Sequence, residues 1–408
     1  MQQPFRFIHA SDFHLERPPR GLAEVPDHLR GAFVEAPYRA AERVFDAAIK
    51  ERVDFVALAG DLLDPLATGP RGLVFIGEQF ERLAEKGIKV YWAGGRADDF
   101  ERWVEAWPLG DNVVRFPLHR AERVIHHRNG EPIAQILGTS SQQRKKIRAS
   151  DFHADGSPLY SVAIAYGSAD AEILAGHEMN FWALGGERAR RVVLSGPTTA
   201  HYCGMPQARR PQETGPQGCT LVQIDETQRV RTNFIATDAI RYQHERVSVS
   251  ETISSEQLLQ VLNARIGELL IDPFGPDLLI YWNILGSKSL SAELRRGKLA
   301  AELLARLRTD HAQSRPAAWT VSIETDAVAN VPGELIDEES VLGEFLRTVQ
   351  HYIEHPEKVV DFEPFLAERH LAGSLGAAVA LDAAERNRVL ADVAALGMEL
   401  LSPEESRS

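Results

Sequence analysis

The chain has 408 residues, of which 44% are hydrophobic and 25% are charged, a composition that excludes a disordered protein and predicts two or three globular domains. Its two cysteines exclude both a disulfide framework and a Cys-x-x-Cys metal site. The amino terminus has no signal-peptide pattern and no apolar run approaches the roughly 18 residues that span a bilayer, so we expect a cytoplasmic protein.

The net charge of −13 is spread unevenly along the chain. Residues 1–240 carry 29 Lys and Arg against 31 Asp and Glu, whereas residues 331–408 carry 6 against 16. The acidity therefore belongs to the carboxyl-terminal region, which would repel a phosphate backbone. The first 240 residues are nearly neutral and can still present a local basic face to one.

Short apolar runs alternate with helical patterns at the start of the chain. Strands are predicted at Phe5–Ala10, Asp54–Ala59 and Ile88–Ala93, which are followed by Ser, Gly and Gly-Gly respectively. Helices are predicted between them, around residues 40–49 and 74–83, because apolar residues recur there every three or four positions. This alternation predicts an α/β layered domain.

Five more strands are predicted within the first 240 residues, and their spacing favours a meander over a series of crossovers. They are Leu159–Tyr166, Phe181–Leu184, Val192–Ser195, Thr220–Ile224 and Thr232–Ile235. A β-sandwich flanked by helices suits both halves of this region, so the predicted fold class of residues 1–240 is α/β with such a sandwich.

Two further regions follow the sandwich. Residues 241–330 alternate strand and helix patterns, including one helix over Leu290–Leu307, and predict a small α+β domain. Residues 331–408 predict an acidic helical region. Its two amphipathic stripes are Val341, Phe345, Leu346, Val349 and Ile353, and Val389, Leu390, Val393, Leu396 and Leu400.

Acidic and imidazole side chains follow the first two predicted strands. Asp12 and His14 come directly after the first strand, and Asp61 after the second. Side chains at the carboxyl ends of parallel strands can converge on one point. Two-metal hydrolysis of phosphate esters uses such carboxylates and imidazoles to hold ions about 3.5–4 Å apart. Turns and helix caps use the same residue types, so the spacing alone leaves both interpretations open.

The order of these motifs resembles that of the calcineurin-like metallophosphoesterases, in particular the SbcD-type and YhaO-type DNA repair exonuclease subunits. The resemblance rests on Phe7–Leu15 and Ala59–Asp64, and later on Phe181–Gly185 and Arg209–Asp225. Residues 241–330 resemble the capping domain of that family, so the resemblance covers about three quarters of the chain. It implies a two-metal Mn²⁺ site.

Several family ligand positions carry other residues in this sequence. The resemblance assigns Asp12, His14 and Asp61 as metal ligands, with Asp61 bridging the two ions. Where the family has Gly-Asn-His-Asp, the Asn ligand is replaced by Arg96 and the His that assists the leaving group by Ala97.

The remaining family imidazoles are also replaced. One His position is Tyr166, and the two in the Gly-His-x-His motif are Gly186 and Arg188. The first metal position thus keeps three of four ligands, and the second keeps only Asp61.

A guanidinium group is not deprotonated in a protein and cannot act as a metal ligand. We therefore predict a degenerate site that holds no metal, or one weakly bound metal. In it, Arg96, together with Arg188, pairs with Asp12 and Asp61 in place of the ions. The alternative is a rebuilt single-metal site with a substitute ligand. The candidate substitutes are Asp98, Asp99, Glu187, His9, His177 and His201.

Basic residues gather at loop positions, where they either line a path for a nucleic-acid backbone or are solvated loop charges. They are Arg144, Lys145, Lys146, Arg209 and Arg210. In the resembled family the carboxyl-terminal helices dock on an SbcC-like or YhaN-like ATPase of the SMC type. The counterpart of residues 22–50 mediates homodimerisation there. The resemblance therefore implies an ATPase partner, a homodimer and DNA as a ligand.

Two functions are consistent with these observations. One is a catalytically impaired, nuclease-derived subunit of a DNA-processing complex. The other is an active metal-dependent exonuclease or phosphoesterase with a remodelled site. The loss of the imidazoles favours the first function on chemical grounds, whereas only membership of the family favours the second.

Overall fold

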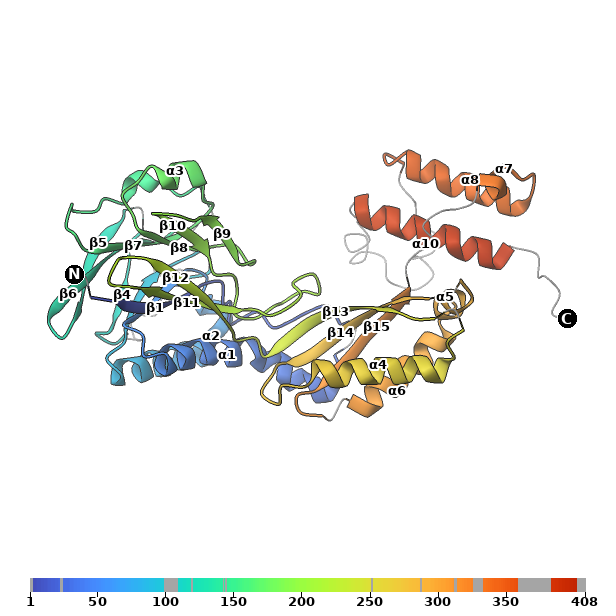
Figure 1. Cartoon of the computed structure of the whole chain (residues 1–408), viewed down its shortest axis with the longest axis horizontal. Coiled ribbons are helices and arrows are strands. Elements are labelled where there is room, and N and C mark those ends of the chain that lie inside the picture. The colour runs from blue at the N-terminus through green and yellow to red at the C-terminus, as the bar shows by residue number, and fades with distance from the viewer. Residues whose placement is uncertain are drawn as a thin grey trace. The chain divides into compact units, whose positions relative to one another are not determined.

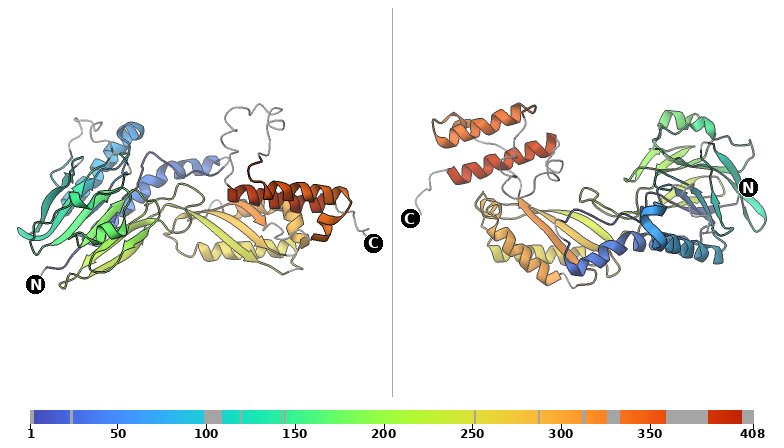
Figure 2. Two further views of the ribbon diagram at one scale, coloured as in Figure 1. Left: turned by 90° about the horizontal axis from the view of Figure 1, so that it is seen from above. Right: turned by 180° about the vertical axis from the view of Figure 1, so that it is seen from behind.

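The structure, a computed structural model, forms two compact units, each described here by itself (Figures 1 and 2). The first contains Met1–Gln243, Asp272–Leu279 and Ser314–Ala318, and the second contains the rest of the chain. No helix among the described residues is long and apolar enough to cross a bilayer. The described residues are 3–22, 25–98, 109–118, 120–141, 143, 145–250, 252–286, 288–311, 314–325, 333–358 and 383–401.

The first sheet of the first unit has the strand order β12-β11-β1-β2-β3-β4. Its strands are β1 (Phe5–Ala10), β2 (Phe55–Ala59), β3 (Lys89–Ala93), β4 (Val113–Arg115), β11 (Gly218–Ile224) and β12 (Val230–Ala236). Strands β1 to β4 are parallel, while β11 is antiparallel to both β1 and β12. The strands predicted in this sheet are confirmed to within two residues at each end, and β4 was not predicted.

The second sheet has the order β5-β6-β7-β8-β10-β9. Its strands are β5 (Glu122–Arg128), β6 (Glu131–Thr139), β7 (Tyr160–Tyr166), β8 (Phe181–Gly185), β9 (Arg191–Leu194) and β10 (Thr199–Tyr202). The predicted meander is wrong for this sheet, because β6, β7, β8 and β10 are parallel, although its last two strands, β11 and β12, do form an antiparallel hairpin in the first sheet. Strands β7 and β8 are buried along their whole length, as central strands of parallel sheets are, and the crossover connections between them are mostly irregular loops.

Aromatic rings fill the space between the two sheets. The rings of Phe7 and Phe55 stack with centroids 4.7 Å apart, and Phe181 from the second sheet meets Phe7 edge to face at 5.4 Å. Helices α1 (Asp27–Lys50) and α2 (Pro65–Glu85) pack on the outer face of the first sheet. The sequence therefore folds into the predicted helix-flanked sandwich, with its strand ends aligned along one edge.

The second unit contains the larger part of each of three strands, which are β13 (Ile240–Ser248), β14 (Asp277–Leu285) and β15 (Ala318–Thr325). Its helix α4 (Ser255–Leu269) starts at a capping box made by Ser254 and Gln257. The helix predicted over Leu290–Leu307 is instead two helices, α5 (Lys288–Arg295) and α6 (Lys298–His311). Gly297 separates them in a left-handed conformation, with φ of 84°.

The carboxyl-terminal helices are α7 (Gly333–Asp337), α8 (Val341–Glu354) and α10 (Ala383–Leu401). Helices α8 and α10 pack on each other through Leu346 and Leu390, among others. The predicted stripes are only partly buried by this contact. The residues left exposed are Val341, Ile353, Val389, Val393, Leu396 and Leu400.

Candidate metal centre

Asp12, His14 and Asp61 meet at the carboxyl ends of β1 and β2. These strands are parallel neighbours with Ala10 opposite Leu58, so the residues after them emerge at one edge of the first sheet. One potential ligand atom from each of the three side chains lies within 4.8 Å of the other two, and all three residues are buried. The structure thus brings together the three residues that the sequence singled out.

The backbone at these three residues is left-handed, with φ of 57° at Asp12, 47° at His14 and 55° at Asp61. This conformation costs a residue other than glycine about 1 to 2 kcal/mol. Two cross-loop hydrogen bonds hold it, from Asp12 N–H to the Gly60 carbonyl at 2.9 Å and from His14 N–H to the Asp61 carbonyl at 3.0 Å. Because such strain clusters at functional sites, it favours a metal or catalytic role over ordinary turns.

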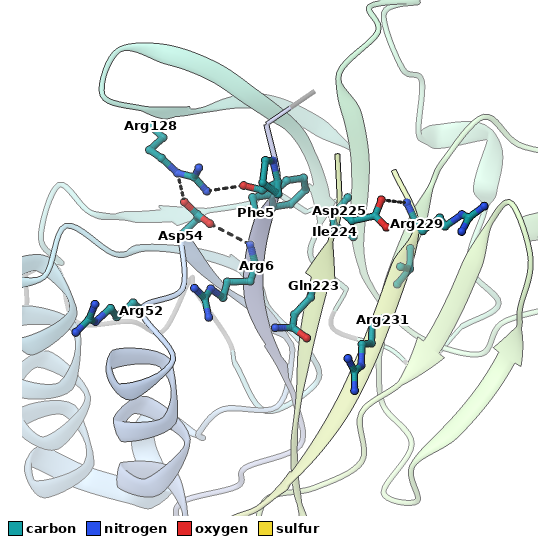
Figure 3. A pocket seen from close by; sticks show the side chains of 12 residues that line it. Phe5, Arg6, Arg52, Asp54, Arg128, Gln223, Ile224, Asp225, Arg229 and Arg231 are labelled. Atoms are coloured by element: carbon teal, nitrogen blue, oxygen red, sulfur yellow. Dashed lines mark hydrogen bonds and ion pairs between the residues drawn. The ribbon is translucent and has the colours of Figure 1, made fainter. Parts of the chain in front are cut away.

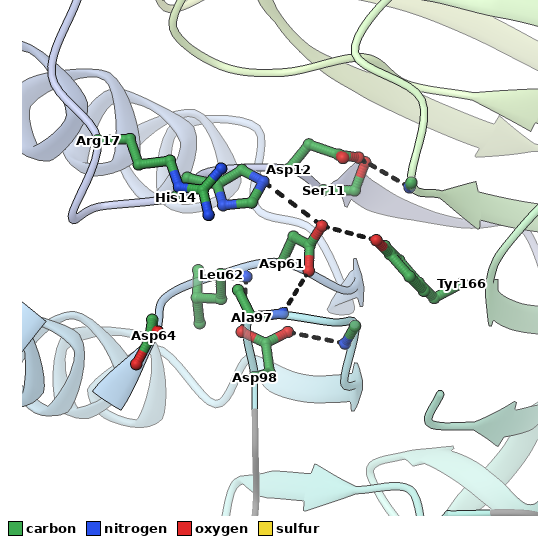
Figure 4. A network of polar contacts seen from close by, with 12 residues as sticks. Ser11, Asp12, His14, Arg17, Asp61, Leu62, Asp64, Ala97, Asp98 and Tyr166 are labelled. Atoms are coloured by element: carbon green, nitrogen blue, oxygen red, sulfur yellow. Dashed lines mark hydrogen bonds and ion pairs between the residues drawn. The ribbon is translucent and has the colours of Figure 1, made fainter. Parts of the chain in front are cut away.

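The Asp61 carboxylate is surrounded by hydrogen-bond donors from three other strand ends (Figure 4). Its Oδ1 accepts from the Ala97 N–H at 2.7 Å, and its Oδ2 accepts from the Tyr166 hydroxyl at 2.8 Å and lies 3.4 Å from His14 Nε2. Burial alone would raise the pKa of Asp61. Hydrogen bonds and the charge of His14 outweigh burial and hold this pKa below its usual value.

Asp12 has the opposite electrostatic balance. Burial, followed by the charge of Asp61, raises the pKa of Asp12, although its Oδ2 accepts from the Ser11 hydroxyl at 2.7 Å and from the Gly186 N–H at 2.9 Å. Burial would lower the pKa of His14, but hydrogen bonds to Asp61 and Glu16 raise it. The charge of His14 acts to lower the pKa of both aspartates.

The predicted pairing of Arg96 and Arg188 with the two aspartates is wrong. The Arg96 side chain is exposed, and Arg188 Nη1 lies 2.9 Å from Glu213. The carboxylates find their partners instead in His14, a tyrosine hydroxyl and backbone N–H groups, as described above. Neutral donors satisfy a buried carboxylate without the desolvation of a guanidinium group, which turns to solvent here.

Three of the substituted family positions nevertheless contact the aspartates. Tyr166, Ala97 and Gly186 each donate a hydrogen bond to Asp61 or Asp12 at 2.7 to 2.9 Å. Gly186 also has a left-handed φ of 95°, and a Cβ there would lie 3.0 Å from the Tyr166 ring. The residue types at Tyr166 and Gly186 are therefore sterically linked. Nothing in the sequence indicated the tyrosine contact, since a buried strand residue is normally a packing residue.

Asp98 braces the loops of the site. Its Oδ1 accepts from the backbone N–H groups of Leu62 and Leu63 at 2.7 and 2.9 Å, and its Oδ2 accepts from Gly95 N–H at 3.0 Å and the Trp92 indole at 3.3 Å. Burial and the charge of Asp61 raise the pKa of Asp98 to about 7. With its oxygens committed to four donors, Asp98 positions the loop after β2.

The structure does not bring the other proposed substitute ligands into the cluster. Both oxygens of Glu187 pair with Arg191, and His177 lines a surface cavity beside Lys145 and Lys146. His9 and His201 lie buried together in the sheets, with ring centroids 5.5 Å apart. Asp99 lies outside the described residues.

The donor set of the cluster fits one divalent cation. Two carboxylates and one imidazole are ligands that Mn²⁺ and Zn²⁺ accept, and three protein ligands leave open positions as in catalytic sites. Among the residues that the structure describes, these three ligands form the single such group.

The basic residues predicted to contact nucleic acid lie in two different environments. Lys145 and Lys146 are exposed on a loop beside the end of β7, where the backbone of Lys146 forms an isolated β-bridge with Ser168. Arg144 lies outside the described residues. Arg210 is exposed, but Arg209 is only 6% exposed.

Arg209 is a buried cation near the cluster. In the described part of the chain its Nε and Nη2 atoms have no hydrogen-bond partner. Burial, and next the charge of Arg188, lowers the pKa of Arg209 to about 10. The charges of Glu213 and Asp12 act in the opposite direction, to raise that pKa. The charge of Arg209 also acts to lower the pKa of His14. Nε and Nη2 form the edge with which a guanidinium binds an oxyanion through two hydrogen bonds.

Residues 5–203 match the calcineurin-like phosphoesterase family, a range that includes Asp12, His14 and Asp61. The chain therefore contains a calcineurin-like metallophosphoesterase domain.

Two named proteins are similar to this chain. The uncharacterized metallophosphoesterase YhaO of Bacillus subtilis is 29% identical over 281 residues, which cover 64% of this chain and 68% of that protein. The DNA double-strand break repair protein Mre11 of Aeropyrum pernix is 33% identical over 93 residues, covering 23% of this chain and 21% of that protein.

The buried imidazole of His201 predicts a loss of stability in acid. Burial, with a smaller effect of Arg190, lowers the pKa of His201 to about 3, whereas in the unfolded chain it is about 6.5. Below pH 6.5 the unfolded chain thus takes up a proton that the folded protein does not. The free energy of unfolding therefore decreases as the pH is lowered. Between pH 6.5 and 4.5 this effect amounts to about 2 to 3 kcal/mol.

Urea unfolding of wild type and His201→Asn across this pH range tests the effect. Between pH 6.5 and 4.5 the free energy of unfolding of the variant should decrease by about 1 to 3 kcal/mol less than that of wild type, whatever its stability at neutral pH. His153→Asn, at an exposed site, is the matched control and should leave the pH dependence unchanged. Parallel pH profiles for wild type and His201→Asn would contradict the prediction.

Proposed function

We propose that this protein is a nuclease-derived subunit of a DNA-processing complex in which two-metal hydrolysis is impaired. One observation carries the proposal: Tyr166, Ala97 and Gly186 donate hydrogen bonds to the two aspartates from family positions whose side chains would bind a metal or assist the leaving group. The similarity to YhaO and to the repair protein Mre11 supports the DNA-processing context.

The alternative is a phosphoesterase with a single metal. The compact cluster of Asp12, His14 and Asp61 and its strained backbone favour this second candidate. A bound Mn²⁺ would act as a Lewis acid on a phosphoryl oxygen. Asp12 and Asp61 would then be held ready by the donors already described, and His14 would have to be neutral to ligate.

Metal stoichiometry tests the proposed loss of the two-metal site, and hydrolysis then separates the two candidates. After incubation with excess Mn²⁺ and gel filtration, elemental analysis should find at most one equivalent per chain. Asp61→Asn should abolish that binding, because the substitution removes a carboxylate ligand. Asp64→Asn is the matched control, since Asp64 caps α2 and Asn is an equally good cap. Two equivalents of Mn²⁺ in the wild type would overturn the proposal.

Hydrolysis of bis(p-nitrophenyl) phosphate completes this test. Wild type and Asp61→Asn should show the same background rate with Mn²⁺ if hydrolysis is impaired. A Mn²⁺-dependent rate that Asp61→Asn removes and Asp64→Asn retains would establish the single-metal enzyme instead.

Arg209 supports a remaining role in holding a phosphate group. Two buried guanidinium nitrogens without hydrogen-bond partners are destabilising, so Arg209→Met should raise the free energy of unfolding by about 1 kcal/mol or more. The same change should weaken binding of fluorescein-labelled single-stranded DNA, measured by anisotropy. Arg210→Met, at the exposed neighbour, should change stability by less than about 0.5 kcal/mol. A loss of stability in Arg209→Met with unchanged DNA binding would exclude this role.

We further propose that α8 and α10 dock on an SMC-type ATPase, as the family resemblance implies. The exposed apolar residues of this helix pair support docking, since Leu400 is 67% and Val341 72% exposed. Val393→Glu with Leu396→Glu should abolish co-purification with a co-expressed SbcC-like or YhaN-like ATPase. Val261→Glu on α4, a site of similar exposure, is the control. Co-purification that survives the double change would refute this surface.

Homodimerisation through residues 22–50 stays a prediction. Sedimentation equilibrium of the full chain tests it, and a monomer at micromolar concentration would contradict it.

A further inference from the structure

A cationic site lies at the opposite end of β1 from the metal cluster, and Figure 3 shows the side chains that line it. A cavity of about 680 Å³ opens at the start of β1, beside the hairpin that joins β11 to β12. Arg6 lines it, whereas Asp12 lies at the other end of β1, six residues away. At about 3.3 Å per residue, the two sites are roughly 20 Å apart.

Five of the twelve residues that line this cavity are arginines, and two are aspartates. We call the five arginines, which are Arg6, Arg52, Arg128, Arg229 and Arg231, the arginine cluster. On a protein whose net charge is −13, this local excess of positive charge is unusual.

The two aspartates do not neutralise the cluster. Asp54 accepts from Arg128 Nε at 2.7 Å and from the backbone N–H of Arg6 at 3.0 Å, so it is matched to one arginine. Asp225 Oδ1 accepts three hydrogen bonds within its own turn, from Thr227 and from the backbone N–H of Arg229. Both carboxylates are therefore used by the local structure.

The remaining guanidinium groups have little or no compensation. Within the described ranges, the side chains of Arg52, Arg229 and Arg231 make no hydrogen bond or ion pair, and Arg6 reaches Glu51 only at 3.9 Å. Arg52 also occupies a left-handed position just after α1, with φ of 49°, where glycine is the usual residue.

Strand pairing aligns donor groups in a row across three strands. Arg6 lies directly opposite Gln223 on β11, and Gln223 lies opposite Arg231 on β12, so the three side chains stand on one face of the sheet. The side-chain oxygen of Gln223, Oε1, accepts from the Asn233 side chain at 3.0 Å. The side-chain NH₂ group of Gln223 is thereby oriented as a donor. The row therefore offers donors to a ligand and no unpaired carboxylate.

We propose that the arginine cluster binds phosphate groups at a site separate from the metal cluster. Guanidinium forks match the oxygens of a phosphate and bind it through paired hydrogen bonds. The aromatic residue of the cavity, Phe5, is only 3% exposed, so it cannot stack on a base, and recognition is of the phosphate alone. The phosphates come from a nucleic-acid backbone or from a small phosphorylated molecule. The site does not depend on whether hydrolysis is retained.

Binding to two probes tests the proposal and distinguishes the sources. The full-length protein is stripped of metal on a chelating resin. Affinity is then measured for a labelled 12-nucleotide single-stranded DNA by anisotropy, and for inorganic pyrophosphate by calorimetry. The double variant Arg6→Gln with Arg231→Gln should lower the affinity for whichever probe the wild type binds by about tenfold or more. For DNA, it should also reduce the slope of log affinity against log salt by roughly 1.4, at about 0.7 per lost contact.

Two further double variants sharpen the result. Arg296→Gln with Arg306→Gln makes the same charge change at exposed arginines of the second unit and should leave affinity within about twofold. Arg6→Lys with Arg231→Lys keeps the charge but not the fork, so its loss should be smaller than that of the Gln pair. Melting temperatures of all variants verify folding.

The outcomes are decisive for the proposal. Loss of DNA binding identifies a nucleic-acid backbone as the source of the phosphates, and loss of pyrophosphate binding alone identifies a small ligand. Wild-type affinity of the Gln pair for both probes would overturn the proposal. The proposal would also be overturned if the wild type bound neither probe, or if the control pair lost as much affinity as the Gln pair.

Discussion

The carboxylate of Asp61 is the point at which the loops of the first unit are joined. Its own loop follows β2, and its three partners come from the loops after β1 and β3 and from the end of β7. A buried anion is tolerated in a protein only when donors surround it, so these four chain segments must reach one point for the fold to be stable. The geometry of the candidate site is therefore a requirement of folding as well as of any chemistry.

The same arrangement shows how the two buried aspartates are accommodated by groups of the protein itself. In a two-metal site the cations neutralise such carboxylates. Here the imidazole of His14, the Tyr166 hydroxyl and two backbone N–H groups lie against their oxygens. Asp98 adds a second layer by fixing the loop that carries Asp61. A buried positive charge near the cluster is that of Arg209, whose Nε and Nη2 atoms have no hydrogen-bond partner within the described structure.

Much of the fold could be predicted from the sequence because apolar runs and their flanking glycines are local signals. Those signals located β1, β2 and β3, and with them Asp12, His14 and Asp61. The direction of strands in the second sheet could not be predicted, since spacing along the chain does not tell a crossover through an irregular loop from a hairpin. The break at Gly297 was missed because the apolar period continues across it.

Side-chain partners were the least predictable feature of the site. The pairing of Arg96 with the aspartates was inferred from charge alone, whereas the structure leaves this side chain in solvent, where its hydration is kept. The contact of Tyr166 with Asp61 joins residues 105 positions apart and depends on how the two sheets stack.

The close approach of Gly186 to the Tyr166 ring couples these two positions. A Cβ at position 186 would already lie 3.0 Å from the ring, and the left-handed φ of 95° strains any residue other than glycine. A larger side chain fits there only if the tyrosine ring shifts, and such a shift would displace the hydroxyl that donates to Asp61. Positions 166 and 186 therefore act as one steric unit, in which a change at either is felt by the Asp61 carboxylate.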